Sequence, residues 1–394
     1  MSRYSEPIIE KNFLQHRFIS NSCVFGLIAW GAPAAFIYPD ELMHIFFGIL
    51  LSFFIFNFRR PSKVSEDFYK SQFEPKSEKY VIPLIIIFAI LYVFIDSIFG
   101  TQKLAGNIFI NTESVSLAVS SQDNQRGQGR GFWELVAAIL IFIPFYLYDL
   151  RTRWNTRLRP YIFFTVFVLV FYEIEASRGY IVAAIACFYL SRRGISFFQI
   201  IIAGLITISL FFLASIFRGD FNDTSFSNPL FSGIVWPYIN LGIYLNADCN
   251  DASAYEFLMQ AFQKFIPSFI MEKNIISFNL EASECMYNLS LDDLGSVSIF
   301  TYMGELFFYK PSLFTSIIAG SILGIATKFF DSFLVIKKFY CLQVFVGLWI
   351  IILFRSRVLD VFSYLIALAL FLIFINFFKT IYLKYFIPLK KVKI

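Results

Sequence analysis

The sequence predicts an all-helical protein that crosses a membrane about ten times, and three observations support this class. First, 58% of the residues are hydrophobic and only 15% are charged, whereas soluble domains average about 25% charged residues. Second, the apolar residues form long runs, such as 80–98, 195–217 and 358–378, which are long enough for a helix to span a bilayer. Third, the charges between the runs are sorted by sign from one loop to the next.

The apolar runs place ten spans along the chain, which we treat as one transmembrane domain over residues 1–394. The predicted spans are residues 18–38, 41–58, 80–99, 132–148, 161–176, 179–190, 195–217, 312–330, 339–354 and 358–378. One connection is much longer than the others: residues 218–311 form a large loop before the last three spans.

Charge sorting gives the orientation of these spans. With the N-terminus in the cytoplasm, 23 of the 33 Lys and Arg residues fall in cytoplasmic segments, and 20 of the 28 Asp and Glu residues fall outside. Because cytoplasmic loops carry an excess of basic residues, we expect both termini in the cytoplasm and the large loop on the outer face. The basic segment 151–154 is then a cytoplasmic loop. The basic residues are dispersed among loops, so we expect no nucleic-acid partner.

The large outer loop contains two segments with recognisable patterns. Ser253 and Glu256 have the spacing of a capping box, which predicts a helix over 253–269. Its predicted apolar face comprises Phe257, Ala261, Phe262, Phe265, Ile266 and Phe269. An amphipathic helix there would lie in the membrane interface or cover a cavity as a lid. The half-apolar stretch 292–308 is too short to span, which predicts a re-entrant or half-depth helix that lines a cavity.

Four arginines stand at ends of apolar runs on the outer face, where positive charge is under-used: Arg178, Arg218, Arg355 and Arg357. Guanidinium groups bind phosphate through planar paired donors and stay charged at any working pH. A hydroxyl that attacks a sugar phosphate also needs a carboxylate as base, and the outer candidates are Glu173, Glu175, Asp292, Asp293 and Glu305.

These residues form the predicted site for a pyrophosphate-linked glycan. The predicted catalytic residues are Arg178, Arg218, Glu175 and Glu305, and the predicted substrate contacts are Arg178, Arg218, Arg355, Arg357, Tyr180 and Tyr302. Simpler interpretations stay open. Arg355 and Arg357 would then only anchor a hairpin, and Glu305 would be a rim charge paired with Lys310.

Cysteine and histidine usage narrows the chemistry further. The chain has two histidines and shows no metal-ligand cluster, no Walker loop and no dinucleotide fingerprint, so we expect neither a metal nor a cofactor. Cys249 and Cys285 share the large outer loop. A disulfide between them is permitted if that side is the bacterial periplasm, although their spacing alone does not fix it.

With these features the chain resembles the Wzy-type O-antigen (oligosaccharide repeat-unit) polymerases of bacterial inner membranes. The likeness covers most of the chain: many spans, a large outer loop before the last three, and an arginine near the start of the final span. The motifs that carry it are Ala176-Ser177-Arg178-Gly179, Leu294-Gly295, Met303-Gly304-Glu305, Pro311, Gly320 and Gly324.

The resemblance implies a GT-C-like, metal-independent glycosyltransferase that faces the periplasm. It would move a growing glycan from undecaprenyl pyrophosphate onto the sugar of a new lipid-linked repeat unit, and a chain-length regulator would be a further partner. Outer-loop arginines are essential in the family, which maps best onto Arg178 and Arg218. The alternatives are an O-antigen ligase, which typically has a histidine in the large loop, and a lipid-linked oligosaccharide flippase or other transporter, which predicts internal repeats.

Overall fold

The computed structural model describes residues 17–58, 141–154, 162, 186–188, 229–247, 249, 252–263, 278–288, 300–355 and 357–385. Within these residues the protein is helical apart from one two-residue bridge, and the chain divides into two compact units. The first unit comprises residues 1–59, 178–260 and 276–361, and the second comprises residues 60–177, 261–275 and 362–394.

Among the described residues, four helices are long and apolar enough to cross a membrane, and all four coincide with predicted spans. They are α1 (Phe18–Ile37), α2 (Pro39–Phe58), α16 (Ser312–Ile336) and α18 (Val358–Tyr385). A shorter apolar helix, α17 (Tyr340–Leu353), covers the predicted span 339–354. Many large apolar side chains on these helices are exposed, including Phe36, Leu51 and Phe329. The helices therefore suggest a multi-pass membrane protein, because an apolar outer face suits contact with lipid.

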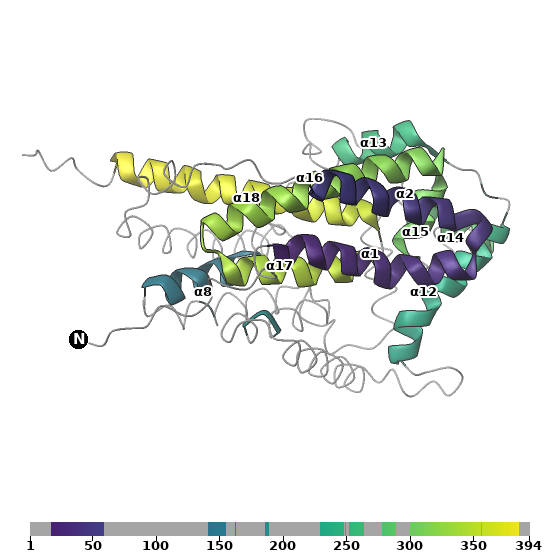
Figure 1. The fold of residues 1–394 in the computed structure, drawn as a ribbon, viewed down its shortest axis with the longest axis horizontal. Coiled ribbons are helices and arrows are strands. Elements are labelled where there is room, and N and C mark those ends of the chain that lie inside the picture. Colours follow the sequence, from purple (N-terminus) through teal and green to yellow (C-terminus); the bar gives the residue numbers. More distant parts are fainter. Residues whose placement is uncertain are drawn as a thin grey trace, which may run out of the picture. The chain divides into compact units, whose positions relative to one another are not determined.

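Four described helices of the first unit pack in two parallel pairs, α1 with α17 and α2 with α16 (Figure 1). Trp30 of α1 donates a hydrogen bond to the Ile351 carbonyl of α17 at 2.9 Å. Successive glycines of α16 meet successive turns of α2, so these two helices run in the same direction. Two spans that run in the same direction are separated by an odd number of crossings. This agrees with the five spans predicted between them, of which residues 80–99, 161–176, 179–190 and 195–217 lie largely outside the described residues.

Small residues allow the backbones of α2 and α16 to approach closely. A Cβ added at Gly324 would lie 2.7 Å from the Phe53 carbonyl oxygen, and one at Gly320 would overlap the Ile49 carbonyl and the Ser52 hydroxyl. Spacing of small residues by four is the usual device for close helix packing in membranes, where lipid removes the hydrophobic drive between helices.

Replacing Gly320 by alanine is therefore expected to destabilise the protein. The new methyl group would meet the backbone of α2 rather than a movable side chain, and overpacking of this kind costs about 1–3 kcal/mol. Thermal unfolding of the purified full-length protein in detergent measures the effect. Ile322→Ala, two residues away on an exposed part of the same helix, is the control. Equal unfolding temperatures for the two variants would contradict the packing argument.

At the end of this unit where α1 ends and α2 begins, four further helices gather (Figure 1). They are α12 (Pro229–Asn246), α13 (Ala254–Gln263), α14 (Phe278–Tyr287) and α15 (Tyr302–Phe308). A parallel bridge joins β1 (Ala252–Ser253) to β2 (Tyr309–Lys310). Neither α12 nor α14 was predicted from the sequence. By the predicted topology this is the outer end of the bundle, which Figure 1 places away from the turn between α16 and α17.

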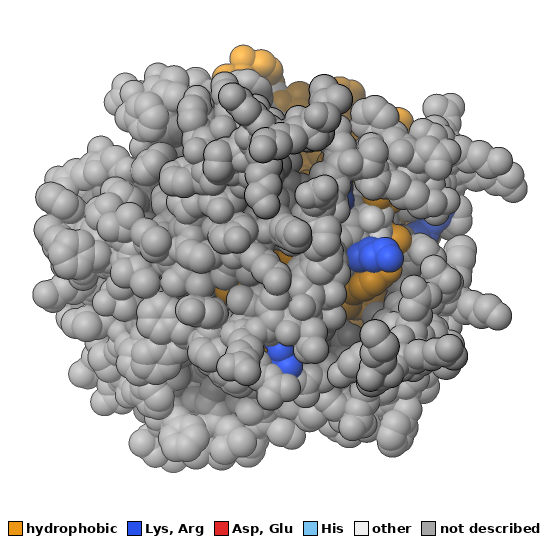
Figure 2. All heavy atoms as spheres, turned by 90° about the vertical axis from the view of Figure 1, so that its left-hand side faces the viewer, with side chains coloured by type: hydrophobic (Ala, Val, Ile, Leu, Met, Phe, Trp, Pro, Cys, Tyr) orange, Lys and Arg blue, Asp and Glu red, His pale blue; other side chains and the backbone are white. Residues whose placement is uncertain are grey.

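The opposite end is the one predicted to face the cytoplasm. Figure 2 looks at this end and shows described Lys and Arg side chains among hydrophobic ones. A buried polar network lies near it: Asp331 of α16 accepts hydrogen bonds from Ile19, Ser20 and Gln343. This network joins α16 to the start of α1 and to α17.

In the second unit, α8 (Ile143–Trp154) packs against α18. The ring of Phe142 lies 5.0 Å from that of Tyr364, and Tyr146 meets Phe371 edge to face at 5.7 Å. The predicted loop 151–154 is wrong at this point, because the helix continues through Trp154. Arg151 is partly buried and lies over the Tyr148 ring at 6.0 Å, a contact that allows an arginine to stay inside the last helical turn.

Candidate functional site

The outer end of the first unit is built around the short helix α15. Its start is fixed by Tyr302, whose backbone N–H donates to the Phe354 carbonyl at the end of α17. It ends at Phe308, where Tyr309 takes an extended conformation, and Pro311 then stands at the N-cap of α16. A short helix between two spans is what the stretch 292–308 predicts. The structure confirms the helix from Tyr302 onward, and the preceding residues 289–299 lie outside the described residues.

Glu305, in the middle of α15, is completely buried. Its Oε2 atom accepts hydrogen bonds from the backbone N–H groups of Val358 at 2.6 Å and Leu359 at 3.2 Å. These are the first two residues of α18, whose N–H groups have no partner within their own helix. Glu305 therefore caps α18 from another element, and its charge is stabilised by both hydrogen bonds and the positive end of the helix. The alternative of an exposed rim charge is wrong for this residue, and the Lys310 ammonium lies over the Phe307 ring at 5.0 Å.

Arg357 immediately precedes α18 and forms a bidentate ion pair with Asp360. Its Nε and Nη2 atoms donate to the two carboxylate oxygens at 3.1 and 2.8 Å. Although burial lowers the pKa of Arg357, the Asp360 and Glu305 carboxylates outweigh it and raise the pKa above its ordinary value. The guanidinium stays charged, and 19% of its side chain remains exposed. Arg355, two residues earlier, is half-buried.

Glu305, Arg357 and Asp360 form a cluster at the start of α18. The outer loop is attached to this cluster through α13. Ser253 and Glu256 form the predicted capping box: the Ser253 backbone N–H donates to the Glu256 carboxylate at 2.5 Å, and the Glu256 N–H donates back to the Ser253 hydroxyl at 3.3 Å. The predicted helix is thus confirmed from residue 254 to 263, and residues 264–269 lie outside the described residues. On its buried face, Phe257 contacts the Tyr309 ring at 5.3 Å. The Oε1 atom of Gln260 accepts a hydrogen bond from the Tyr309 hydroxyl at 2.9 Å.

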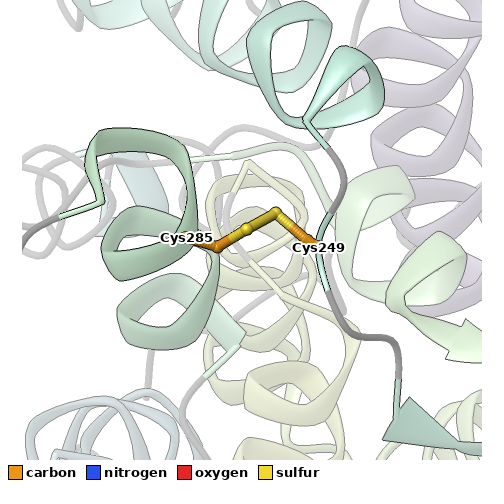
Figure 3. The surroundings of a disulfide bond; sticks show 2 residues. All are labelled: Cys249 and Cys285. Carbon is orange, nitrogen blue, oxygen red and sulfur yellow. A yellow bond between two sulfur atoms is a disulfide. The ribbon is translucent and has the colours of Figure 1, made fainter.

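A disulfide between Cys249 and Cys285 ties this loop together (Figure 3). Cys285 lies on α14, and Cys249 follows α12, 36 positions earlier in the chain. Closing a loop of this length restricts the unfolded chain and stabilises the folded loop by about 3–4 kcal/mol in the chain-entropy description. The bond settles the pairing that the spacing of the two cysteines left open.

Tyr302 lies inside the bundle. Its side chain is completely buried, its hydroxyl donates to the Leu27 carbonyl of α1 at 2.9 Å, and its ring packs edge to face against Phe354 at 5.3 Å. This geometry favours a role in fixing α15 to α1 and α17. A substrate contact by Tyr302 stays a prediction.

The structure brings together only part of the predicted site. Glu305 and Arg357 meet at the start of α18, and Arg355 stands beside them in the chain. The other predicted site residues, Arg178, Arg218, Glu175 and Tyr180, lie outside the described residues. Among the described residues, no group of His, Cys, Asp and Glu side chains could hold a metal ion.

Three residues in or next to this cluster were not predicted: Asp360, Gln260 and Tyr309. The spacing of three between Arg357 and Asp360 is a signal that could have shown the ion pair, since residues three apart face each other on a helix. Gln260 is a polar residue three positions after Phe257 on an otherwise apolar face. Tyr309 gives no such signal, because its partner is 49 positions away.

Comparisons with known proteins identify no relative of this chain. The chain matches no protein-family model, no curated protein and no solved structure.

Proposed function

We propose that the protein is an O-antigen, or surface polysaccharide, polymerase of the bacterial inner membrane. It transfers a growing glycan from undecaprenyl pyrophosphate to the sugar of a new lipid-linked repeat unit on the periplasmic face. The observation that carries this proposal is the cluster at the start of α18. A charged arginine, Arg357, is held there by Asp360 and by the helix that Glu305 caps, at the outer end of several apolar helices.

The chemistry asks for cations rather than for an acid. The acceptor hydroxyl oxygen attacks the anomeric carbon of the donor sugar, the bond from that carbon to the pyrophosphate oxygen breaks, and undecaprenyl pyrophosphate leaves with the electron pair. Guanidinium donors stabilise the charge that develops on the leaving oxygen. The hydroxyl proton passes to a carboxylate within hydrogen-bond reach.

The contacts of Glu305 bear on which carboxylate takes this proton. Glu305 is buried, and its Oε2 atom is occupied by two backbone N–H groups. These contacts favour a positioning role for Glu305, which would hold the start of α18 and thereby Arg357. Glu175 is then the better candidate for the base.

Charge balance requires more than one arginine. Arg357 faces two carboxylates, those of Asp360 and Glu305, so with both ionised this group of three has an excess of negative charge. A pyrophosphate brings further negative charge, and its binding therefore needs additional cations. Arg355 is the nearest along the chain, and Arg178 and Arg218 are the predicted ones.

The outward orientation has support from the disulfide. Disulfides form and persist in oxidising compartments such as the periplasm and are rare in the cytosol. The bond between Cys249 and Cys285 lies in the segment that charge sorting assigns to the outer face. The two independent observations agree on the side of the membrane to which the candidate site belongs.

Deletion of the gene tests the proposed function, with surface glycan separated by gel electrophoresis. A polymerase deletion leaves single-repeat material and removes the ladder of longer chains. A ligase deletion leaves polymer on its lipid carrier and none on lipid A-core. A flippase deletion removes outward-facing lipid-linked repeat units altogether. Either of the last two patterns would overturn the proposal.

Replacing Arg178 by alanine in the complemented deletion strain is expected to leave the protein inserted in the membrane and to abolish long glycan chains. The reason is the loss of one cation from a site that needs several to hold a pyrophosphate. The gel pattern should show single-repeat material, as in the deletion. An unchanged chain-length distribution would remove Arg178 from the mechanism.

A further inference from the structure

The amide group of Gln260 is only half used within the described structure. Its side chain is 3% exposed, and its Oε1 atom accepts the Tyr309 hydroxyl at 2.9 Å. The Nε2 atom of the same amide is buried and has no hydrogen-bond partner among the described residues. Buried polar groups in folded proteins are nearly always hydrogen-bonded, so each exception needs a physical reason. A ligand that brings an acceptor oxygen is such a reason.

A chain of contacts links this amide to the cluster at the start of α18. Tyr309, the partner of Gln260, follows Glu305 by four residues, about one helical turn. Glu305 in turn binds the N–H group of Val358, the residue after Arg357. Gln260 is thus connected to the guanidinium through two hydrogen-bonded contacts and one turn of chain.

The electrostatics of Tyr309 agree with this proximity. Burial raises the pKa of Tyr309, the Glu305 carboxylate raises it further, and Arg357 lowers it. Both charged groups are therefore close enough to Tyr309 to act on its titration. The hydroxyl stays protonated and is available as the donor to Gln260.

The structure holds Gln260 in place through several independent contacts. The capping box fixes the start of α13, the bridge between β1 and β2 aligns Ser253 with Lys310, and Phe257 packs on the Tyr309 ring. A side chain held in this way loses little further freedom when it binds a ligand. Preorganisation of this kind is typical of binding sites.

We infer that Gln260 is a further substrate-contacting residue, whose Nε2 group donates a hydrogen bond to an acceptor oxygen of the glycosyl pyrophosphate head group. The inference rests on the proposed function, since Arg357 would hold the pyrophosphate next to it. A phosphate oxygen and a sugar hydroxyl oxygen offer the same acceptor chemistry. Through this contact the large outer loop would take part in binding and would not serve only as a cover.

The test uses the purified full-length protein in detergent and two probes: undecaprenyl pyrophosphate, and undecaprenyl pyrophosphate that carries N-acetylglucosamine. Ligand-induced shifts in thermal unfolding give the affinities. Gln260→Met keeps the length of the side chain and removes both polar atoms. Tyr309→Phe is the matched control, because it removes the same hydrogen bond from the other side and leaves Nε2 in place.

Gln260→Met is expected to weaken binding about 10-fold, the size of one lost hydrogen bond to a charged or polar ligand, and Tyr309→Phe by less than about 3-fold. Weakening for both probes supports the inference with a phosphate oxygen as acceptor. Weakening for the sugar-bearing probe alone supports it with a sugar oxygen. Equal affinities of wild type and Gln260→Met for both probes, or equal losses in Gln260→Met and Tyr309→Phe, would overturn it.

A second variant keeps the test valid if Gln260→Met fails to fold. Gln260→Glu retains an acceptor for the Tyr309 hydroxyl, removes the Nε2 donor and is expected to weaken binding by at least the same factor, about 10-fold. Failure of the proposed function looks different, because the wild-type protein would then bind neither probe. Wild-type binding that Gln260→Glu leaves unchanged would overturn the inference about Gln260 alone.

Discussion

Replacing Arg357 by alanine is expected to abolish long glycan chains while the full-length protein still accumulates in the membrane. Asp360 and Glu305 keep the guanidinium charged, and the bidentate pair with Asp360 fixes its plane. Loss of one preorganised donor to a developing negative charge typically lowers a rate by about 100- to 1,000-fold. The measurement is the glycan ladder in a deletion strain complemented with the variant, with the amount of membrane protein determined by immunoblot.

Two further variants separate charge, geometry and folding in this prediction. Arg357→Lys keeps a positive charge but loses the planar pair of donors, so it should restore only a small part of the polymer. Lys310→Ala removes an exposed cation from the same end of the bundle, where it lies over the Phe307 ring, and should leave the ladder unchanged. A normal ladder in Arg357→Ala, with normal protein levels, would exclude this arginine from the transfer step.

The long apolar runs predicted the membrane helices well because a span is decided locally, by length and hydrophobicity. The predicted spans 18–38 and 41–58 each match α1 and α2 at one end and differ by one or two residues at the other. Helix ends were predicted less well. α16 continues six residues beyond its predicted end at 330 because Asp331, which reads as a loop charge in the sequence, is bonded inside the bundle.

The helices of the outer loop depend on contacts that the sequence does not display. α12 contains Pro237 and two glycines, which read as loop residues. A Cβ at Gly242, one of these glycines, would overlap the Tyr38 hydroxyl, so the helix is selected by its close fit to the chain between α1 and α2. α14 is joined to the residue after α12 by the disulfide between Cys249 and Cys285. In contrast, the capping box of α13 is local, and its sequence pattern was sufficient.

In the candidate site, too, features set by the local sequence could be predicted and features set by distant contacts could not. Residue type indicated that Arg357 and Glu305 were unusual, because ionisable groups at the ends of apolar runs are costly without a partner. Their partners could not be inferred, since Glu305 binds N–H groups 53 and 54 positions away. Backbone donors leave no trace in a sequence. A rim charge at Glu305 is therefore wrong, and its role as a site residue stays a prediction.

Asp331 and Glu305 solve the same physical problem at opposite ends of the first unit. Each is a buried carboxylate that binds the free N–H groups at the start of a helix elsewhere in the chain. Asp331 accepts hydrogen bonds from the N–H groups of Ile19 at 2.9 Å and Ser20 at 2.8 Å, where the side chain of Arg17 in the N-cap position makes no capping hydrogen bond to α1. In lipid no water replaces such partners, so a carboxylate from a neighbouring helix satisfies these groups and fixes the two helices together.

Replacing Asp331 by alanine should therefore produce the largest loss of stability in the described structure. Two backbone N–H groups of α1 and the amide of Gln343, now bonded at 2.7 Å, would stay buried without their acceptor. An unsatisfied buried donor costs about 1–3 kcal/mol, and the loss of a helix cap costs a similar amount, so we expect a destabilisation of about 3 kcal/mol or more. Thermal unfolding in detergent and the yield of membrane-inserted protein measure it.

Asp331→Asn tests the same network with almost no change in volume. Asp331 accepts four hydrogen bonds, two at each oxygen. An asparagine in either orientation would turn one of these oxygens into a donor that faces other donors, so this variant should also unfold at a markedly lower temperature. Ser321→Ala is the matched control, because the Ser321 hydroxyl is exposed and bonds only within its own helix, to Ile317. If Asp331→Asn were as stable as this control, these hydrogen bonds would not hold the helices together, and side-chain packing alone would have to explain the association of α1 with α16.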